Sequence, residues 1–197
     1  MTDDLAVFGL ARREVRLVPH DPRWAEAYRR EAERLRQALG VHALEIAHIG
    51  STAVPGLAAK PLLDIMVGIT SLEERGAVIP LLENAGYEFR PHDTLPERLF
   101  FIAGAPEARR VNLSLAKLGS AFWRDHLAFR DILRARPEVA AAYGRLKADL
   151  AQQYPGDRLA YTAAKGEFIT GVLAAGAQQV GQAGQGTSSR EASSRRG

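Results

Sequence analysis

Residues 48–69 read HIGSTAVPGLAAKPLLDIMVGI, and this stretch decides the fold. Its last eight residues, 62–69, form a nearly continuous apolar run that holds a single acid, Asp64. Such a run is typical of a central strand with both faces covered. Residues 44–49 predict a second strand, which ends at Gly50, and the turn-forming residues 50–56 follow it. The stretch therefore predicts two strands of one sheet with a glycine-rich turn between them.

The same stretch holds the residues that point to chemistry. A Gly50-Ser51 pair at the end of a strand offers backbone N–H groups and a hydroxyl, which suit phosphate oxygens. Asp64 lies in an apolar strand, where a carboxylate is costly unless it meets a metal or a cation, and Lys60 precedes it. One interpretation is a phosphate and metal site. The other is a glycine-rich turn beside a carboxylate that is paired for structural reasons alone.

Outside this stretch the pattern alternates between strands and helices. Helices are expected at residues 22–39, with Asp21 as N-cap, at 71–84, 121–134, 139–150 and 159–173, and strands near 14–18, 87–90, 98–103 and 110–116. The expected fold class is α/β (α+β): a small mixed sheet with flanking helices, followed by a C-terminal helical bundle. The expected domains are a flexible N-terminus (1–12), an α/β domain (13–118), a helical domain (119–175) and a disordered tail (176–197).

Charge and composition narrow the class of partner. The 197 residues have a net charge of +3, but residues 1–175 hold 23 basic and 22 acidic side chains, so the excess lies in the tail. This distribution argues against a nucleic-acid partner, which needs a basic groove. The absence of cysteine excludes disulfides and thiolate metal sites. With no apolar run long enough for a bilayer and an acidic N-terminus, the sequence predicts a cytoplasmic protein without membrane association.

The stretch 48–69 also carries a family resemblance. Together with LAFRD at 127–131, RPE at 136–138, YGRLK at 143–147 and AYTAAK at 160–165, it resembles the GrpB family over roughly residues 14–175. That family is assigned to the nucleotidyltransferase superfamily, so the resemblance implies a nucleotidyltransferase-like fold related to the DNA polymerase beta palm. It implies that Gly50 and Ser51 contact a triphosphate and that Asp64 holds Mg²⁺ (or Mn²⁺). Family members fused to dephospho-coenzyme A kinase imply a link to that kinase of coenzyme A biosynthesis.

Three residues depart from the expected pattern. Superfamily enzymes carry a second acid two residues after the first, where two carboxylates on one strand face can share two metal ions, but here that position is Met66. Many family members have a His-Leu-His strand, and this chain has Asn112 and Ser114 in place of the histidines. These changes weaken the case for catalysis more than the case for nucleotide binding.

The helical half supplies candidate phosphate clamps. Lys165 interrupts an apolar row that includes Tyr161, so its ammonium needs a partner such as a triphosphate. Arg130 and Lys147 could equally be structural, with each side chain snorkelling to solvent beside an apolar stripe. Arg98 could equally form a surface ion pair. His48 is interpreted as a hydrogen-bonded structural residue. The expected nucleotide-binding residues are Gly50, Ser51, Thr52, Arg98, Arg130, Lys147, Tyr161 and Lys165; Asp64 and Lys60 are the expected catalytic residues, and Asp64 is the expected metal ligand.

Two functional hypotheses follow, and a third is weaker. The first is a Mg²⁺-dependent (or Mn²⁺-dependent) enzyme that moves NMP from a nucleoside triphosphate to an unknown acceptor hydroxyl or phosphate, with Gly50 and Ser51 on the β- and γ-phosphates. The second is a non-catalytic module that binds nucleotide or stabilises a partner, which Met66, Asn112 and Ser114 favour. The third, nucleic-acid binding by the tail, rests on only three Arg residues.

Overall fold

A five-stranded mixed sheet forms the centre of the molecule. The structure is a computed structural model that describes residues 7–11 and 14–191, with side chains up to residue 178. The strands are β1 (Glu45–Ile49), β2 (Leu63–Ile69), β3 (Glu88–Phe89), β4 (Arg98–Ala105) and β5 (Ala108–Lys117), in the order β1-β2-β5-β4-β3. β2 and β5 are parallel, and the other neighbours are antiparallel. The predicted α/β class with a small mixed sheet is confirmed.

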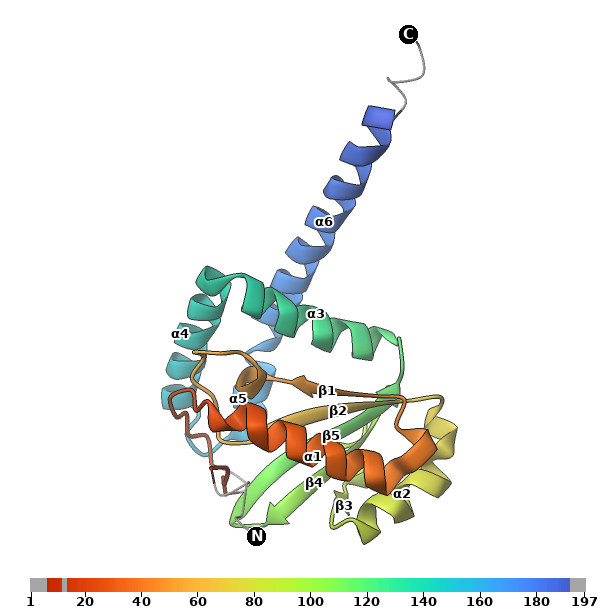
Figure 1. The fold of residues 1–197 in the computed structure, drawn as a ribbon. Coiled ribbons are helices and arrows are strands. Elements are labelled where there is room, and N and C mark those ends of the chain that lie inside the picture. Colours follow the sequence, from red (N-terminus) through yellow and green to blue (C-terminus); the bar gives the residue numbers. More distant parts are fainter. Residues whose placement is uncertain (1–6, 12–13, 192–197) are drawn as a thin grey trace.

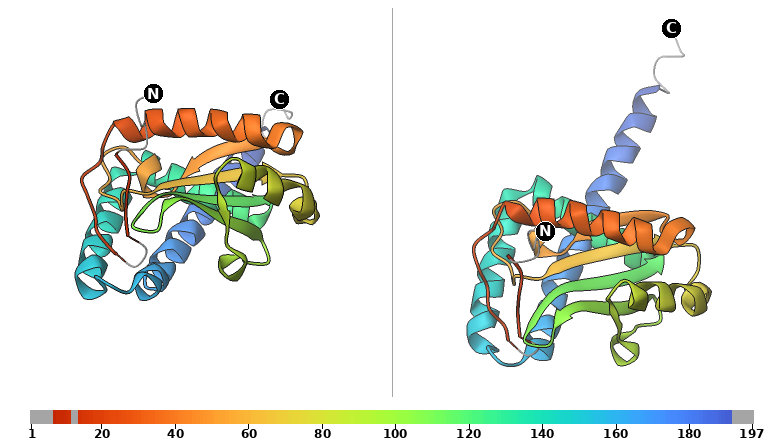
Figure 2. Two further views of the ribbon diagram at one scale, coloured as in Figure 1. Left: turned by 90° about the horizontal axis from the view of Figure 1, so that it is seen from below. Right: turned by 60° about the horizontal axis from the view of Figure 1, so that its bottom comes forward.

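The two faces of the sheet are covered by different helices. α1 (Arg23–Leu39) and α2 (Arg75–Asn84) bury the main core against one face, as Figures 1 and 2 show. α3 (Ala121–Ala135) lies over the other face, and α4 (Pro137–Gln153), α5 (Arg158–Ala163) and α6 (Gly166–Glu191) follow it. Because strand side chains alternate, Ile65 and Val67 of β2 join the α1/α2 core while Asp64 and Met66 face the helical half.

Local chemistry explains where the helices of the second half begin. The Ser120 hydroxyl accepts a hydrogen bond from the Trp123 backbone N–H at the start of α3. Pro137 opens α4, and the Asp157 carboxylate accepts from the first N–H groups of α5. The single helix predicted over 159–173 is divided, because α5 ends at Ala163 and α6 begins at Gly166.

Both ends of the chain differ from the expected boundaries. Residues 7–11 of the expected flexible N-terminus pack on the sheet: Phe8 and Leu10 are buried, and Leu10 pairs with Arg109 through backbone hydrogen bonds. Residues 176–191 of the expected disordered tail continue α6, which contains no proline and projects beyond the rest of the chain (Figure 1). Residues 1–6, 12–13 and 192–197, which also fall in these predictions, lie outside the described residues.

Two further sequence expectations meet a different outcome. Residues 14–18 form no strand; Val18 makes one isolated bridge with Ala59. The helix predicted over 71–84 begins as a 3-10 turn at Leu72–Glu74, capped by Ser71, before α2. No helix among the described residues is both long enough and apolar enough to cross a membrane.

Candidate functional site

A cavity of about 490 Å³ opens between the Asp64 face of the sheet and the helical half. β2, β4 and β5 supply its floor, and α3, α4, α5 and α6 supply its walls. The cavity collects most of the residues that the sequence singled out: Gly50, Ser51, Thr52, Lys60, Asp64, Arg98, Lys147, Tyr161 and Lys165 all line it. Segments more than a hundred residues apart therefore meet at one place.

Gly50 brings the turn into close contact with Asp64. Its φ of +70° lies in the left-handed region that favours glycine. A Cβ atom at this position would lie 2.6 Å from Asp64 Oδ2, so a side chain would collide with the carboxylate. Ser51 then starts the 3-10 turn Ser51–Ala53 beside the cavity. Glycine is therefore required here both by backbone conformation and by space.

Asp64 is held by the neighbouring parallel strand. Its partner in register is Asn112, whose Nδ2 donates to Asp64 Oδ1 at 2.7 Å. The other amide atom, Asn112 Oδ1, is a buried acceptor without a hydrogen-bond partner among the described residues. Both residues line the cavity, and carboxylate and amide oxygens are ligands that Mg²⁺ accepts.

Lys147 of α4 reaches the Gly50-Ser51 turn from the helical half. Its side chain is 1% exposed, and Nζ lies 3.0 Å from Ser51 Oγ while also donating to the Ala58 carbonyl. The ring of Tyr143, one turn earlier on α4, lies 5.0 Å from the ammonium. Burial, with Lys165 and Lys60 nearby, lowers the pKa of Lys147 to about 7.

Two more lysines share one aromatic ring. Lys60 Nζ lies 5.1 Å and Lys165 Nζ 4.6 Å from the ring centroid of Tyr161, so both make cation–π contacts. Burial and the charge of Lys165 lower the pKa of Lys60 to about 7, against the opposing effect of Asp64. Burial also lowers the pKa of Lys165. The expected apolar row of Tyr161 and Lys165 therefore does face the cavity.

The other end of the cavity is aromatic. The guanidinium of Arg98 lies 4.2 Å from the ring centroid of Phe100, and its Nη1 is 3.4 Å from Ser114 Oγ. Phe122 of α3 packs against His126, with ring centroids 4.1 Å apart. Burial lowers the pKa of both Arg98 and His126. The cavity thus has a lysine-rich end and an aromatic end, with Asp64 on its floor.

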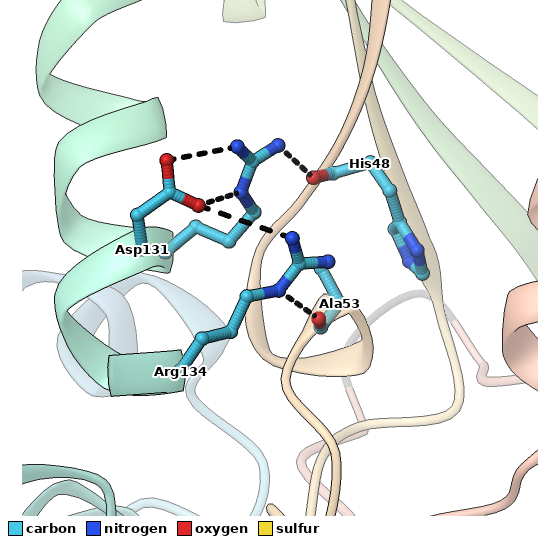
Figure 3. A network of polar contacts seen from close by, with 5 residues as sticks. His48, Ala53, Asp131 and Arg134 are labelled. Atoms are coloured by element: carbon cyan, nitrogen blue, oxygen red, sulfur yellow. Dashed lines mark hydrogen bonds and ion pairs between the residues drawn. The ribbon is translucent and has the colours of Figure 1, made fainter. Parts of the chain in front are cut away.

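Arg130 is one expected site residue that lies elsewhere. Its guanidinium pairs with Asp131 and donates from Nη1 to the His48 carbonyl at 3.1 Å, and it does not line the cavity. Figure 3 shows Asp131 and Arg134 of α3 facing the turn that carries Ala53, whose carbonyl accepts from Arg134 Nε at 2.8 Å. Arg130, expected to bind phosphate, instead links α3 to the end of β1 by a hydrogen bond. Arg134, one turn further along α3, links the same helix to the turn after β1.

His48 has the structural role that the sequence favoured. It is 6% exposed, stacks on Tyr28 with centroids 4.6 Å apart, and shares a hydrogen bond of 3.0 Å between Nε2 and Thr52 Oγ1. Burial and the nearby Arg134 and Arg130 lower its pKa to about 3. The imidazole is therefore neutral, and it fixes the position of Thr52 at the edge of the cavity.

Four residues of the cavity are not among the site residues that the sequence predicts. They are Tyr143, His126, Arg158 and Asp125. The hydroxyl of Tyr143 is hydrogen-bonded to Ser51, and burial raises the pKa of this tyrosine. A hydroxyl or imidazole inside an apolar stripe was the available signal, since such groups need a partner when buried.

The metal-binding capacity of the cavity is small. Among the described residues, no three His, Asp or Glu side chains gather where they could hold a metal ion together. Met66, at the position of a second acid, is fully buried and packs with Ala47, Ile49 and Trp123. On the cavity floor, a metal ion could therefore be held by the Asp64 carboxylate, with the Asn112 amide beside it.

Comparisons with known proteins agree on one family. The family model "GrpB protein" matches residues 14–175. A UPF0157 protein of Pseudomonas aeruginosa is 38% identical over 162 residues, 81% of this chain and 66% of that protein. A dephospho-CoA kinase of Mycolicibacterium paratuberculosis is 32% identical over 186 residues, 82% of this chain and 46% of the kinase. The chain thus spans less than two thirds of either relative.

A solved structure shares the fold as well. The crystal structure of conserved protein GrpB from Enterococcus faecalis superposes with a TM-score of 0.75 at 32% sequence identity, covering 84% of this chain and 99% of that chain. The family model, which matches residues 14–175, includes the sheet and the helical segments that enclose the cavity. Sequence and fold therefore lead to the same conclusion: the chain belongs to the GrpB family.

Proposed function

We propose that the cavity binds a nucleoside triphosphate together with Mg²⁺ and transfers NMP to an acceptor hydroxyl or phosphate. The observation that carries this proposal is the gathering of Lys60, Lys147 and Lys165 beside the Gly50-Ser51 turn and Asp64. The proposal includes membership of the nucleotidyltransferase superfamily, which the parallel β2/β5 pair with Asp64 and Asn112 in register supports.

Electrostatics favour a polyanion at the lysine-rich end. The ammonium groups of Lys147, which is buried, and of Lys60 and Lys165, which are half-buried, repel one another, and the pKa of Lys60 and of Lys147 is lowered to about 7. Asp64 opposes this charge for Lys60 and Lys165. A triphosphate brings several negative charges and many acceptor oxygens, so it would pair with Lys60 and Lys165 and favour their charged form.

The cavity floor fits a divalent cation that arrives with the nucleotide. Asp64 and the buried acceptor Asn112 Oδ1 would hold Mg²⁺, which commonly binds through one or two carboxylates plus substrate phosphates and water. When bound, the ion supplies neutralisation of the charge that develops on the departing pyrophosphate. Within residues 7–11 and 14–191, the structure shows no dedicated acidic cluster that would hold the ion without nucleotide.

The residues of the chain divide the remaining work. Gly50 and Ser51 position the β- and γ-phosphates through backbone N–H groups and a hydroxyl, while Lys60, Lys147 and Lys165 neutralise charge. The Tyr161 ring holds Lys60 and Lys165 in place. The aromatic end with Arg98 and Phe122 would receive the nucleoside, because a base can stack on a ring or a guanidinium plane.

A second candidate function is nucleotide binding without catalysis. Met66 favours it, because the position of a second carboxylate is occupied by a buried apolar side chain. In that case the chain would sense nucleotide or stabilise a partner. The similarity to a dephospho-CoA kinase, of which the chain spans 46%, makes that kinase of coenzyme A biosynthesis the partner we propose to test.

Thermal unfolding with each of the four NTPs, with and without Mg²⁺ or Mn²⁺, tests the proposal. A ligand present at about 100 times its Kd adds about 2.7 kcal/mol to the free energy of unfolding. Stabilisation that needs both NTP and metal, with pyrophosphate released in a parallel assay, supports NMP transfer. Stabilisation without pyrophosphate release supports the binding function, and no response to any NTP contradicts both.

A further inference from the structure

The contact between Ser51 and Lys147 has a second chemical consequence. Lys147 Nζ lies 3.0 Å from Ser51 Oγ, which is hydrogen-bond distance for transfer of the hydroxyl proton. The Ala58 carbonyl accepts another proton of the same nitrogen and fixes its direction. Tyr143 is hydrogen-bonded to the same serine. Ser51, Lys147 and Tyr143 thus form one connected group beside the cavity.

Lys147 has the properties of a general base. Its side chain is 1% exposed, and the groups that face it are the lysines 60 and 165 and the Tyr143 ring, with no carboxylate hydrogen-bonded to it within the described residues. Burial and like charge favour the neutral amine, whose lone pair can accept the serine proton. Serine–lysine pairs of this kind activate serine hydroxyls as nucleophiles.

We propose that Ser51 is a phosphoryl acceptor: its Oγ attacks the terminal phosphorus of a bound nucleoside triphosphate while Lys147 takes the hydroxyl proton. The Oγ–P bond forms, the bond between that phosphorus and the bridging oxygen breaks, and the nucleoside diphosphate leaves with the electron pair. The step rests on the proposed NTP binding, because the Gly50-Ser51 turn then lies at the terminal phosphates. It differs from NMP transfer, which breaks a bond at the α-phosphorus.

The cavity would also retain the product. A phosphoserine carries a charge of about −1.5 to −2 at neutral pH and three acceptor oxygens. Lys147 is already within reach of Ser51, and Lys60 and Lys165 interact electrostatically with Lys147. The phosphorylated Ser51 would therefore occupy the place of the triphosphate and exclude a further NTP. Phosphorylation would switch nucleotide binding off.

Intact-mass spectrometry of the full chain tests this inference. The protein is incubated with Mg²⁺ and each NTP, quenched in acid and digested for site mapping. The expected result is a mass gain of one phosphoryl group per chain, located at Ser51, with nucleoside diphosphate as the co-product. The Ser51→Ala protein gains no mass, and Ser120→Ala, which removes a serine that does not line the cavity, keeps the modification.

The Lys147→Arg variant distinguishes the role of Lys147 as a general base from its role as a positive charge. Arginine keeps a cation near Ser51 but cannot release its proton at neutral pH. We expect this variant to lose at least tenfold in the rate of phosphorylation while NTP still raises its melting temperature. Equal phosphorylation rates in wild type and Lys147→Arg would overturn the role of Lys147. If the variant fails to fold, site mapping on the wild type still decides whether Ser51 accepts the group.

The wild-type measurements separate this inference from the proposed function. NTP-dependent stabilisation or pyrophosphate release without a phosphoryl group on Ser51 overturns the inference and leaves the proposed function standing. A phosphoryl group found at another residue overturns it as well. The absence of any response to NTP removes both.

Discussion

At the scale of single residues, Asp64 carries the metal dependence of the proposed function. Its Oδ1 accepts from Asn112 Nδ2, and Gly50 packs against it without room for a Cβ atom. We expect Asp64→Asn to fold normally, because the amide is nearly the same size, and to lose the Mg²⁺-dependent part of NTP stabilisation. Thermal unfolding with NTP, with and without Mg²⁺, measures this. If Asp64→Asn unfolds, and if NTP stabilisation of the wild type does not depend on Mg²⁺, the role of Asp64 is purely structural.

Lys165 tests whether the helical half takes part in binding. Its ammonium lies on the Tyr161 ring, and burial lowers its pKa. Lys165→Met keeps the apolar stem and removes the buried charge, so stability without ligand should be unchanged or slightly higher. NTP affinity should fall by about 1.5–3 kcal/mol, the worth of a hydrogen bond to a charged group. Calorimetric titration checks this, and unchanged affinity in a folded variant would exclude Lys165 from the site.

At the scale of elements, the packing of β2 determines whether a second metal-binding carboxylate can stand beside Asp64 on the same strand face. Met66 lies on the same face as Asp64 but is fully buried with Ala47, Ile49 and Trp123. Met66→Asp would place an acid in this cluster, and we expect a loss of several kcal/mol in the free energy of unfolding. Urea unfolding measures it, with Met66→Leu as the matched control at a cost below about 1.5 kcal/mol. A stable Met66→Asp protein with faster pyrophosphate release would instead reveal a weakened two-metal site.

α6 combines a packed part with a projecting part. A Cβ atom at Gly176 would lie 2.8 Å from Ile132 Cδ1, so this glycine lets α6 approach α3 closely. Beyond it the helix projects away from the sheet and the other helices (Figure 1). Removing residues 179–197 should therefore change the free energy of unfolding by less than about 0.5 kcal/mol and leave NTP binding intact. A large loss in thermal or urea unfolding would mean that the projecting part makes a stabilising contact.

At the scale of the whole molecule, the buried lysines predict how stability depends on pH. For Lys60 and Lys147 the pKa is about 7 in the folded protein and 10.5 ordinarily, so the unfolded chain binds more protons between these values. Stability without ligand should therefore rise from pH 7 to pH 9, by at most about 1.4 kcal/mol per pH unit for each lysine. Above pH 9 the buried tyrosines Tyr143 and Tyr161, whose pKa values burial raises, oppose the trend.

Urea unfolding at several pH values between 7 and 9 measures this slope. Lys147→Met, which removes one of the two titrating amines, should be more stable than wild type at pH 7 and show a smaller slope. A bound triphosphate should flatten the dependence, because it favours the ammonium form of Lys60, so that its affinity falls as the pH rises. A flat profile without ligand would show that the lysines stay fully charged in the folded protein.

The sequence by itself determined the central strand β2 and the residues at the centre of the candidate site. The apolar run 62–69 predicts β2 because a strand buried on both faces needs apolar side chains at nearly every position. Gly50, Ser51 and Asp64 lie within fourteen residues of one another in sequence, so their meeting follows from the turn between two paired strands. Helical periodicity placed Lys165 beside Tyr161, and the two side chains do meet, although Lys165 lies in the turn between α5 and α6 and not on one continuous helix.

Only the tertiary structure decided which helices reach the site and with which side chains. Periodicity gives the buried face of a helix but not the neighbour that this face meets, so Arg130 and Lys147 looked equivalent in the sequence. In the fold, Arg130 donates to the His48 carbonyl outside the cavity, whereas Lys147, 96 residues from Ser51, contacts that hydroxyl. The same docking of α4 on the Gly50-Ser51 turn buries the lysine, lowers its pKa and pairs it with the serine, because desolvation and proximity arise only once the two halves pack together.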